Sequence, residues 1–169
     1  EGLRRIAQRI HNQTTVLAKG LERLGHQVVH GHFFDTLRVR PAGTSADEVM
    51  EAALGLGINL RDFEDGTLGI ALDETVTPAD LDDLFTAFAG GDRVGFAEEL
   101  SGGVEAVEFP RPLVRTSAYM EHPVFHSHRS ETELLRYTKK LESRDLSMTT
   151  SMIPLGSCTM QLNATTEMV

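Results

Sequence analysis

The stretch INLRDFEDGTLGIAL, residues 58–72, contains the clearest fold signal in this sequence of 169 residues. Two runs rich in apolar residues, 58–63 and 67–72, flank Glu64-Asp65-Gly66. An Asp-Gly pair between two such runs is typical of a tight turn joining paired strands, because glycine adopts positive φ without steric cost. We therefore expect a β-hairpin at this position.

Upstream of the hairpin, the sequence predicts one long amphipathic helix followed by two strands. Apolar residues recur at roughly helical spacing before Gly25, which is a plausible C-cap. These residues are Leu3, Ile6, Ile10, Val16, Leu17, Leu21 and Leu24. The runs 27–30 and 33–40 are rich in β-forming residues, and Pro41 and Gly43 end the second run.

Two further helices complete the first half of the chain. Ser45 is a predicted N-cap because acidic residues occupy the turn that follows it. Thr77-Pro78 opens the next helix with proline at its first position. The order helix, two strands, helix, two strands, helix predicts an α+β fold in which helices cover a sheet.

The character of the sequence changes after Ala89, where glycine pairs and prolines interrupt the pattern around one short expected helix near residues 93–100. Ser130 then caps a further helix. We expect a small α+β domain at 1–89, a linker at 90–115 and the incomplete start of a second domain at 116–169. Since the last part has little apolar surface and the sequence begins inside a helix, we expect the chain to be a piece of a longer protein.

Composition excludes several functions. The formal net charge is −9 and the basic residues are scattered, so the chain would repel nucleic-acid phosphates and anionic membranes. No apolar run approaches the roughly 20 residues that a membrane helix needs. The single cysteine cannot form an internal disulfide, which indicates a reducing compartment. We therefore expect neither nucleic acid nor a membrane among the partners.

One loop near the C-terminus, SMIPLGSCTMQLN at residues 151–163, combines several reactive or donating groups. It places Cys158 between Ser157 and Thr159, after the flexible Gly156. A thiolate beside a base could act as a nucleophile, or the thiol could be structural. Alternatively, the hydroxyl and backbone N–H groups could donate hydrogen bonds to a phosphate or carboxylate.

Two other sets of side chains are weighed as binding groups. Arg61, on a predicted strand, could hold a carboxylate through two parallel hydrogen bonds, or could form a surface ion pair. His122, His126 and His128 lie close together, but no recognisable ligand motif accompanies them. We expect these histidines to be solvated or packed and expect no metal site. The acidic residues of 80–83 are expected to form a solvated helix face.

A series of motifs resembles the glycine cleavage system P-protein family, which are pyridoxal-phosphate-dependent glycine decarboxylases. Those that look like the end of the family's N-terminal half are FFDTL at 33–37, INLR at 58–61, DGTLGIALDET at 65–75 and DLDDLF at 80–85. Those that look like the start of its C-terminal half are RTS at 115–117, SETELLRYTKKLESRDLS at 130–147 and SMIPLGSCTMQLN at 151–163. The resemblance covers nearly the whole chain, and the last motif is highly specific.

The resemblance implies a fold, a reaction and partners. Each half of a P-protein resembles a pyridoxal-phosphate enzyme of fold type I and ends in a small α+β domain, as expected here for 1–89. The chain would cross the junction of the two halves in a single-chain, homodimeric form. The implied reaction releases CO₂ from glycine and passes the aminomethyl group to the lipoyl arm of the H-protein. The implied location is the cytoplasm of a bacterium or the mitochondrial matrix of a eukaryote.

The lysines limit what this chain can do alone. Pyridoxal phosphate is bound by a lysine, and Lys19, Lys139 and Lys140 each lie on a predicted amphipathic helix. We therefore expect the cofactor lysine to lie outside this chain, no catalytic residue within it, and no activity of the isolated fragment. The alternative function is a non-catalytic binding or scaffold module that supports assembly.

The residues expected to contact cofactor or substrate in the parent are Gly156, Ser157, Cys158, Thr159 and Arg61. The sequence departs from the family's pattern in two places. Gln161 stands where a lysine is expected, which puts an anion-binding role of that position in doubt. His126, His128 and Arg129 stand where Asn, Tyr and His are expected.

Overall fold

A computed structural model describes residues 2–103 and 111–144 of the chain. By their contacts the residues fall into two units, Glu1–Val114 and Arg115–Val169. In chain order the helices and strands are α1 (Gly2–Arg23), β1 (Gln27–Val28), β2 (Thr36–Arg40), α2 (Ala46–Gly55), β3 (Arg61–Asp62), β4 (Leu68–Ala71), α3 (Pro78–Phe88), α4 (Ala97–Ser101) and α5 (Glu131–Glu142). Short 3₁₀ turns lie at Arg111–Leu113 and Pro123–His126.

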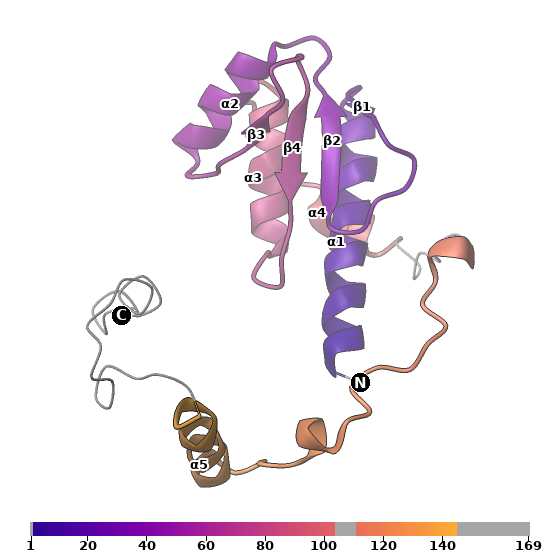
Figure 1. Ribbon diagram of the computed structural model, residues 1–169. Helices are drawn as coiled ribbons and strands as arrows, with labels where there is room; N and C mark the ends of the chain where they lie inside the picture. The colour runs from indigo at the N-terminus through magenta and orange to yellow at the C-terminus, as the bar shows by residue number, and fades with distance from the viewer. Residues whose placement is uncertain (1, 104–110, 145–169) are drawn as a thin grey trace. The chain divides into compact units, whose positions relative to one another are not determined.

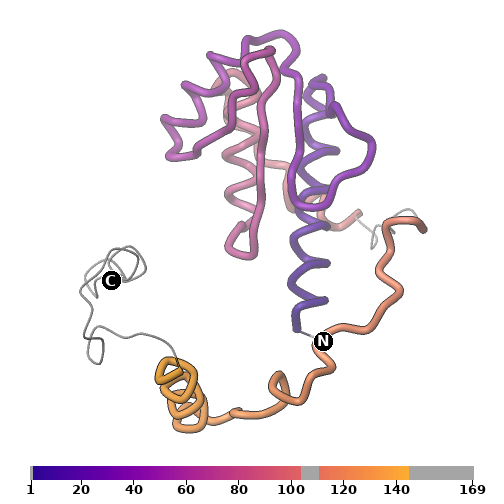
Figure 2. The backbone as a smooth tube through the Cα atoms, in the orientation of Figure 1, coloured from indigo at the N-terminus to yellow at the C-terminus, as the bar shows by residue number. Residues whose placement is uncertain are grey.

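The strands form one antiparallel sheet in the order β1-β2-β4-β3. Helices α1 and α3 lie behind this sheet in the view of Figures 1 and 2, and α2 packs on α3. No described helix of the first unit covers the near face of the sheet (Figure 1). The prediction of an α+β fold with helices against a sheet is therefore confirmed.

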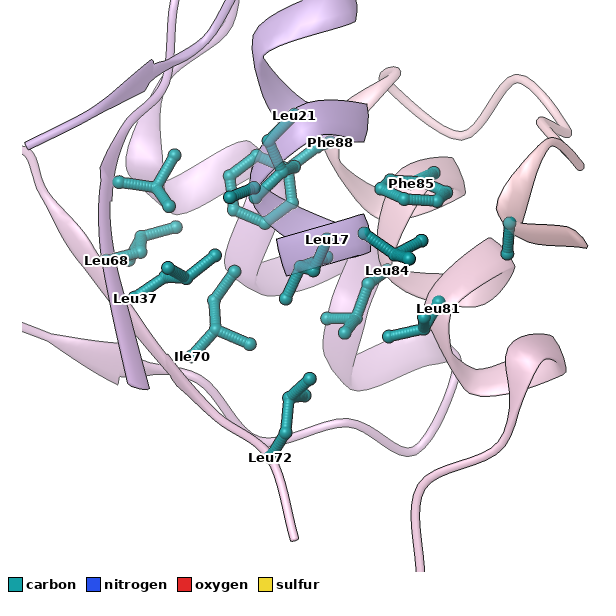
Figure 3. Close-up of a cluster of buried hydrophobic side chains, with 14 of the residues drawn as sticks. Leu17, Leu21, Leu37, Leu68, Ile70, Leu72, Leu81, Leu84, Phe85 and Phe88 are labelled. Atoms are coloured by element: carbon teal, nitrogen blue, oxygen red, sulfur yellow. The ribbon is translucent and has the colours of Figure 1, made fainter. Parts of the chain in front are cut away.

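The core lies between the sheet and the helices. Alternation along β2 turns Leu37 and Val39 toward the helices, whereas Arg38 and Arg40 point to the opposite face. In Figure 3 apolar side chains from β2, β4, α1 and α3 converge on one another. The residues labelled there are Leu17, Leu21, Leu37, Leu68, Ile70, Leu72, Leu81, Leu84, Phe85 and Phe88, all within the core cluster.

The predicted helix starts are confirmed, and each uses the same local device. The side chain of Ser45 accepts a hydrogen bond from the backbone N–H of Glu48, whose carboxylate accepts one from Ser45 in return. Thr77 and Ser130 make the same reciprocal pair at the starts of α3 and α5. These capping boxes satisfy N–H groups that the helix itself cannot pair.

The hairpin is confirmed, but its strands are shorter than the sequence predicts. Glu64 has φ +59° and Gly66 φ +76°, so the chain reverses between Phe63 and Thr67. β3 covers only two residues, and the predicted run 33–40 pairs only from Thr36 onward. β3 is an edge strand with β4 as its one neighbour, and so fewer of its residues find a partner.

Within the predicted linker, α4 packs against α1 and α3. Ala97 is fully buried, and its backbone N–H donates to the carboxylate of Asp82 over 2.9 Å. The first unit thus extends beyond Ala89, and the domain limits at 89 and 115 remain a prediction. Among the described helices, none combines the length and the apolar character that crossing a membrane would require.

Candidate functional site

Arg61 lies on the sheet face that the helices of the first unit leave uncovered. The register pairs Arg38 of β2 with Gly69 of β4, and Gly69 with Arg61 of β3. Side chains of directly paired residues point to the same face, so the two arginines flank a glycine. We call the surface formed by Arg38, Arg40, Arg61, Phe63, Thr67 and Gly69 the open sheet face.

Phe63 occupies the space above Gly69. A Cβ added at Gly69 would lie 3.0 Å from Cε2 of Phe63 and 3.3 Å from Cβ of Arg61. The guanidinium carbon of Arg38 is 4.2 Å from the centre of the Phe63 ring, and that of Arg61 is 5.1 Å from it. Cation–π contacts of this kind hold a guanidinium against an aromatic surface while its N–H groups stay available to other acceptors.

Arg38 is held by the hairpin turn. Its Nε donates to the hydroxyl of Thr67 over 2.8 Å, and its Nη2 forms an ion pair with Asp65 at 2.7 Å. Thr67 is only 1% exposed, so this hydroxyl is a rigid acceptor. Hydrogen bonds from the hydroxyl and backbone N–H of Thr67, with the charges of Arg38 and Arg40, keep the pKa of the Asp65 carboxyl below its usual value.

Arg61 and Arg40 keep most of their hydrogen-bonding capacity. Arg40 donates to the backbone carbonyl of Asp65 over 3.1 Å. Among the residues that the structure describes, the Arg61 guanidinium has neither an ion pair nor a hydrogen bond, and it stacks on Phe63. The alternative of a surface ion pair therefore finds no partner within 2–103 and 111–144. A guanidinium in this state can bind a carboxylate through two parallel hydrogen bonds.

The other predicted contact residues, Gly156, Ser157, Cys158 and Thr159, lie outside the described residues, as does Gln161. The position of this loop relative to Arg61 therefore lies outside what the structure describes. Their proposed roles stay predictions.

The three histidines of the second unit make separate local contacts. Nδ1 of His122 accepts a hydrogen bond from the backbone N–H of Val124, and Nε2 of His126 is 3.0 Å from the carbonyl of Met120. His128 stacks on Tyr137 with ring centres 4.2 Å apart. Within 2–103 and 111–144, no group of His, Cys, Asp and Glu side chains is arranged to hold a metal ion.

Sequence reasoning missed His26, which is 5% exposed and connects the loop after β2 to the C-terminal end of α3. The backbone N–H of Ala42 donates to Nδ1 over 3.1 Å, so Nε2 carries the proton and donates to the carbonyl of Phe88 at 3.1 Å. Burial lowers the pKa of His26 below its usual value, although the Phe88 carbonyl acts in the opposite direction. Both partners are backbone groups distant in sequence, so no local pattern could have revealed them.

All three lysines of the chain are described, and none is enclosed. Lys19 is exposed on α1, and Lys140 is exposed on α5. Lys139 pairs with Glu142 at 2.8 Å and is also exposed. A covalently bound aldehyde cofactor needs a lysine enclosed in a pocket, and these exposed lysines do not fit that requirement.

Comparisons with known proteins agree with the motifs. The profile of the family described as glycine cleavage system P-protein matches residues 1–88. The chain is 52% identical over 168 residues to the glycine dehydrogenase (decarboxylating) of Synechocystis sp., covering 99% of this chain and 17% of that protein. It is 50% identical to the mitochondrial glycine dehydrogenase (decarboxylating) of Homo sapiens, over 99% of this chain and 16% of that protein.

The corresponding protein of Nostoc punctiforme is 51% identical, over 100% of this chain and 18% of its own length. The chain thus spans between 16% and 18% of the length of these relatives. The match to the family profile extends over more than half of the chain, and identity near one half extends over nearly all of it. This chain belongs to the glycine cleavage system P-protein family.

Proposed function

We propose that this chain is part of a glycine decarboxylase that releases CO₂ from glycine and passes the aminomethyl group to the lipoyl arm of an H-protein. The observation that carries this proposal is 52% identity to a glycine dehydrogenase (decarboxylating) over 99% of the chain. Such identity extends through both units, which favours a common role for the whole segment. The two units would then be the end of the N-terminal half and the start of the C-terminal half of one P-protein.

The proposed cofactor is pyridoxal phosphate, which serves as an electron sink for decarboxylation when bound. Because Lys19, Lys139 and Lys140 are all exposed on helices, we place the cofactor lysine in sequence outside this chain. The first unit would be the small domain of a fold type I half. The 169-residue chain is accordingly expected to be inactive alone.

Within the parent, the proposed roles of this chain's residues are those of binding. Arg61 would hold the carboxylate of glycine, which its uncommitted guanidinium and its support by Phe63 favour. Ser157 and Thr159 would donate hydrogen bonds to an anionic group, and Gly156 would let the backbone come close. Cys158 would be a spacer, because this reaction requires no thiolate from the protein.

The proposed setting follows from the same relationship. The parent would be a homodimer that meets lipoylated H-protein, in the cytoplasm of a bacterium or in a mitochondrial matrix. The human relative is a mitochondrial form and the Synechocystis relative comes from a bacterium, which is compatible with either location.

The test is glycine decarboxylation by the full-length parent, with pyridoxal phosphate and lipoylated H-protein. Arg61→Ala should raise the KM for glycine, with Arg93→Ala, at an exposed position, as the matched control. Ser157→Ala or Thr159→Val should lower the rate about ten- to a hundred-fold, since one hydrogen bond to a charged group contributes about 1.5–3 kcal/mol. Cys158→Ala should cost much less.

Three results would change this assignment. An unchanged KM in Arg61→Ala would remove Arg61 from the glycine site. Loss of activity in Cys158→Ala alone would replace the proposed hydrogen-bond donation by Ser157 and Thr159 with a thiol mechanism. A loaded parent that binds H-protein but never decarboxylates glycine would favour the scaffold alternative.

A further inference from the structure

Phe63 is a large aromatic side chain that lies outside the core of the first unit. Among the described residues it belongs neither to the buried apolar cluster nor to the half-buried apolar side chains packed against that cluster. Its backbone N–H donates to the carbonyl of Thr67 over 3.2 Å, so the chain at Phe63 continues the pairing of the hairpin. Side chains two residues apart on an extended strand point to the same face, which places the Phe63 ring and Arg61 together on the open sheet face. The contacts that hold this ring are therefore those of the open sheet face rather than those of the core.

This ring is held by groups that are themselves fixed. Gly69 leaves space for it, since a Cβ added there would lie 3.0 Å from Cε2 of the ring. The guanidinium carbon of Arg38 lies 4.2 Å from the ring centre, and the hydroxyl of Thr67 and the carboxylate of Asp65 hold this guanidinium. The ring thus has a defined position before any substrate arrives. It presents an aromatic surface to Arg61, whose guanidinium carbon is 5.1 Å from the ring centre.

The acidic residues next to Arg61 do not take the place of the ring. Asp62 accepts a hydrogen bond from the backbone N–H of Glu64 over 2.7 Å. Within 2–103 and 111–144, the structure records no ion pair between Arg61 and either carboxylate. The contact with Phe63 is therefore what orients the Arg61 guanidinium in the part of the chain that the structure describes.

We propose that Phe63 is a positioning residue that keeps the Arg61 guanidinium in the orientation in which it receives the carboxylate of the substrate. This role rests on the proposed function, because it takes Arg61 as the group that holds the carboxylate of glycine. A free arginine side chain samples many rotamers, and a guanidinium already held against a ring loses less conformational entropy when it binds. In this role Phe63 acts through Arg61 and not by contact with the substrate.

The first measurement tests the contact in the 169-residue chain by NMR. A ring face close to the Arg61 side chain shifts the proton resonances of that side chain upfield. This shift should be present in the wild type and in Phe63→Tyr, which keeps the ring, and absent in Phe63→Leu. Gly69→Ala should alter the shift because its Cβ pushes on the ring, whereas Gly55→Ala, with nothing within 4 Å of the added Cβ, is the matched control and should not.

The second measurement compares the KM and kcat for glycine in the full-length parent with pyridoxal phosphate and lipoylated H-protein. Phe63→Leu should raise KM about two- to fivefold and leave kcat unchanged, since an exposed cation–π contact contributes about 0.5–1 kcal/mol. Phe63→Tyr should keep the wild-type KM. In an Arg61→Ala background, Phe63→Leu should have no further effect, because the ring then has no guanidinium to position.

Each other outcome overturns the proposal. An unchanged KM in Phe63→Leu, together with a raised KM in Arg61→Ala, rejects the positioning role and leaves the glycine site of Arg61 intact. Equal effects of Phe63→Leu with and without Arg61, or a fall in kcat with KM unchanged, show that the ring acts in another way. Absence of the ring shift in the wild type rejects the contact itself. An unchanged KM in Arg61→Ala rejects the proposed function of Arg61 and this role with it, while the NMR result for the contact stands.

Discussion

Gly20 is the position where the packing of the first unit leaves no room for a single methyl group. A Cβ at Gly20 would lie 2.2 Å from Cε1 and Cζ of Phe85, and 3.0 Å from Cε2 of Phe96. Phe85 is fully buried and stacks on Phe96 with ring centres 4.5 Å apart. Gly20→Ala must therefore displace the Phe85 ring, or α3 together with it, from its packed position against α1.

Two opposing effects set the magnitude. Alanine is better than glycine inside a helix by roughly 1 kcal/mol. Overpacking a well-packed core costs typically about 1–3 kcal/mol, occasionally more. Because the 2.2 Å contact lies far inside the van der Waals distance, the upper part of that range applies. We expect a net destabilisation of about 1–2 kcal/mol.

Thermal unfolding of the 169-residue chain, followed by far-ultraviolet circular dichroism, measures this effect. For a unit of roughly 100 residues, about 1 kcal/mol corresponds to roughly 4–8 °C, so Tm should fall by roughly 4–16 °C. Gly55→Ala, at the last residue of α2 with nothing within 4 Å of the added Cβ, is the matched control and should leave Tm unchanged or raise it. A Tm for Gly20→Ala equal to or above that of the wild type would refute the packing argument.

Two further predictions concern the buried imidazole of His26 and the expected lack of a cofactor-binding lysine in this chain. Burial lowers the pKa of His26 in the folded state below its usual 6.5, so the unfolded state binds the proton more tightly. The contribution of neutral His26 to the free energy of unfolding is therefore complete above pH 6.5. It is lost as the pH falls through 6.5 toward the lowered pKa of the folded state. Urea unfolding should show this loss in the wild type and not in His26→Phe, and a wild type equally stable on both sides of pH 6.5 would contradict it. Mixed with pyridoxal phosphate, the isolated chain should show no internal-aldimine absorbance, because its lysines are exposed on helices. A borohydride-trappable adduct at one specific lysine would show that this chain does contain a cofactor pocket.

Local chemistry made several features predictable from the sequence. Ser45, Thr77 and Ser130 each supply a side-chain oxygen for the N–H three residues later, so these helix starts depend on four consecutive residues. Asp65-Gly66 specifies the hairpin turn in the same way. The motifs that resemble the P-protein family were likewise visible in the sequence, and the family is confirmed by the match over residues 1–88.

Asp82 shows where local patterns stop being sufficient. Together with its acidic neighbours it was expected to lie on a solvated helix face, but its carboxylate accepts the N–H of Ala97 and so connects α3 to the start of α4. His26 likewise depends on Ala42 and Phe88, which reach it only after the sheet and α3 have packed. Such contacts join residues that are distant in sequence, so a pattern within a short stretch of sequence cannot predict them.

The sequence by itself determined the helix starts, the hairpin turn and the family, because short runs of residues encode each of them. Only the tertiary structure decided that Arg61, Gly69 and Arg38 share one row of a sheet face that no described helix of the first unit covers. That row depends on the register of three strands, and a slip of one residue would turn each side chain to the opposite face. Strand pairing therefore decides which charged side chains meet at the candidate site and which face they share. The sequence of each strand alone determines only that its side chains alternate between the two faces.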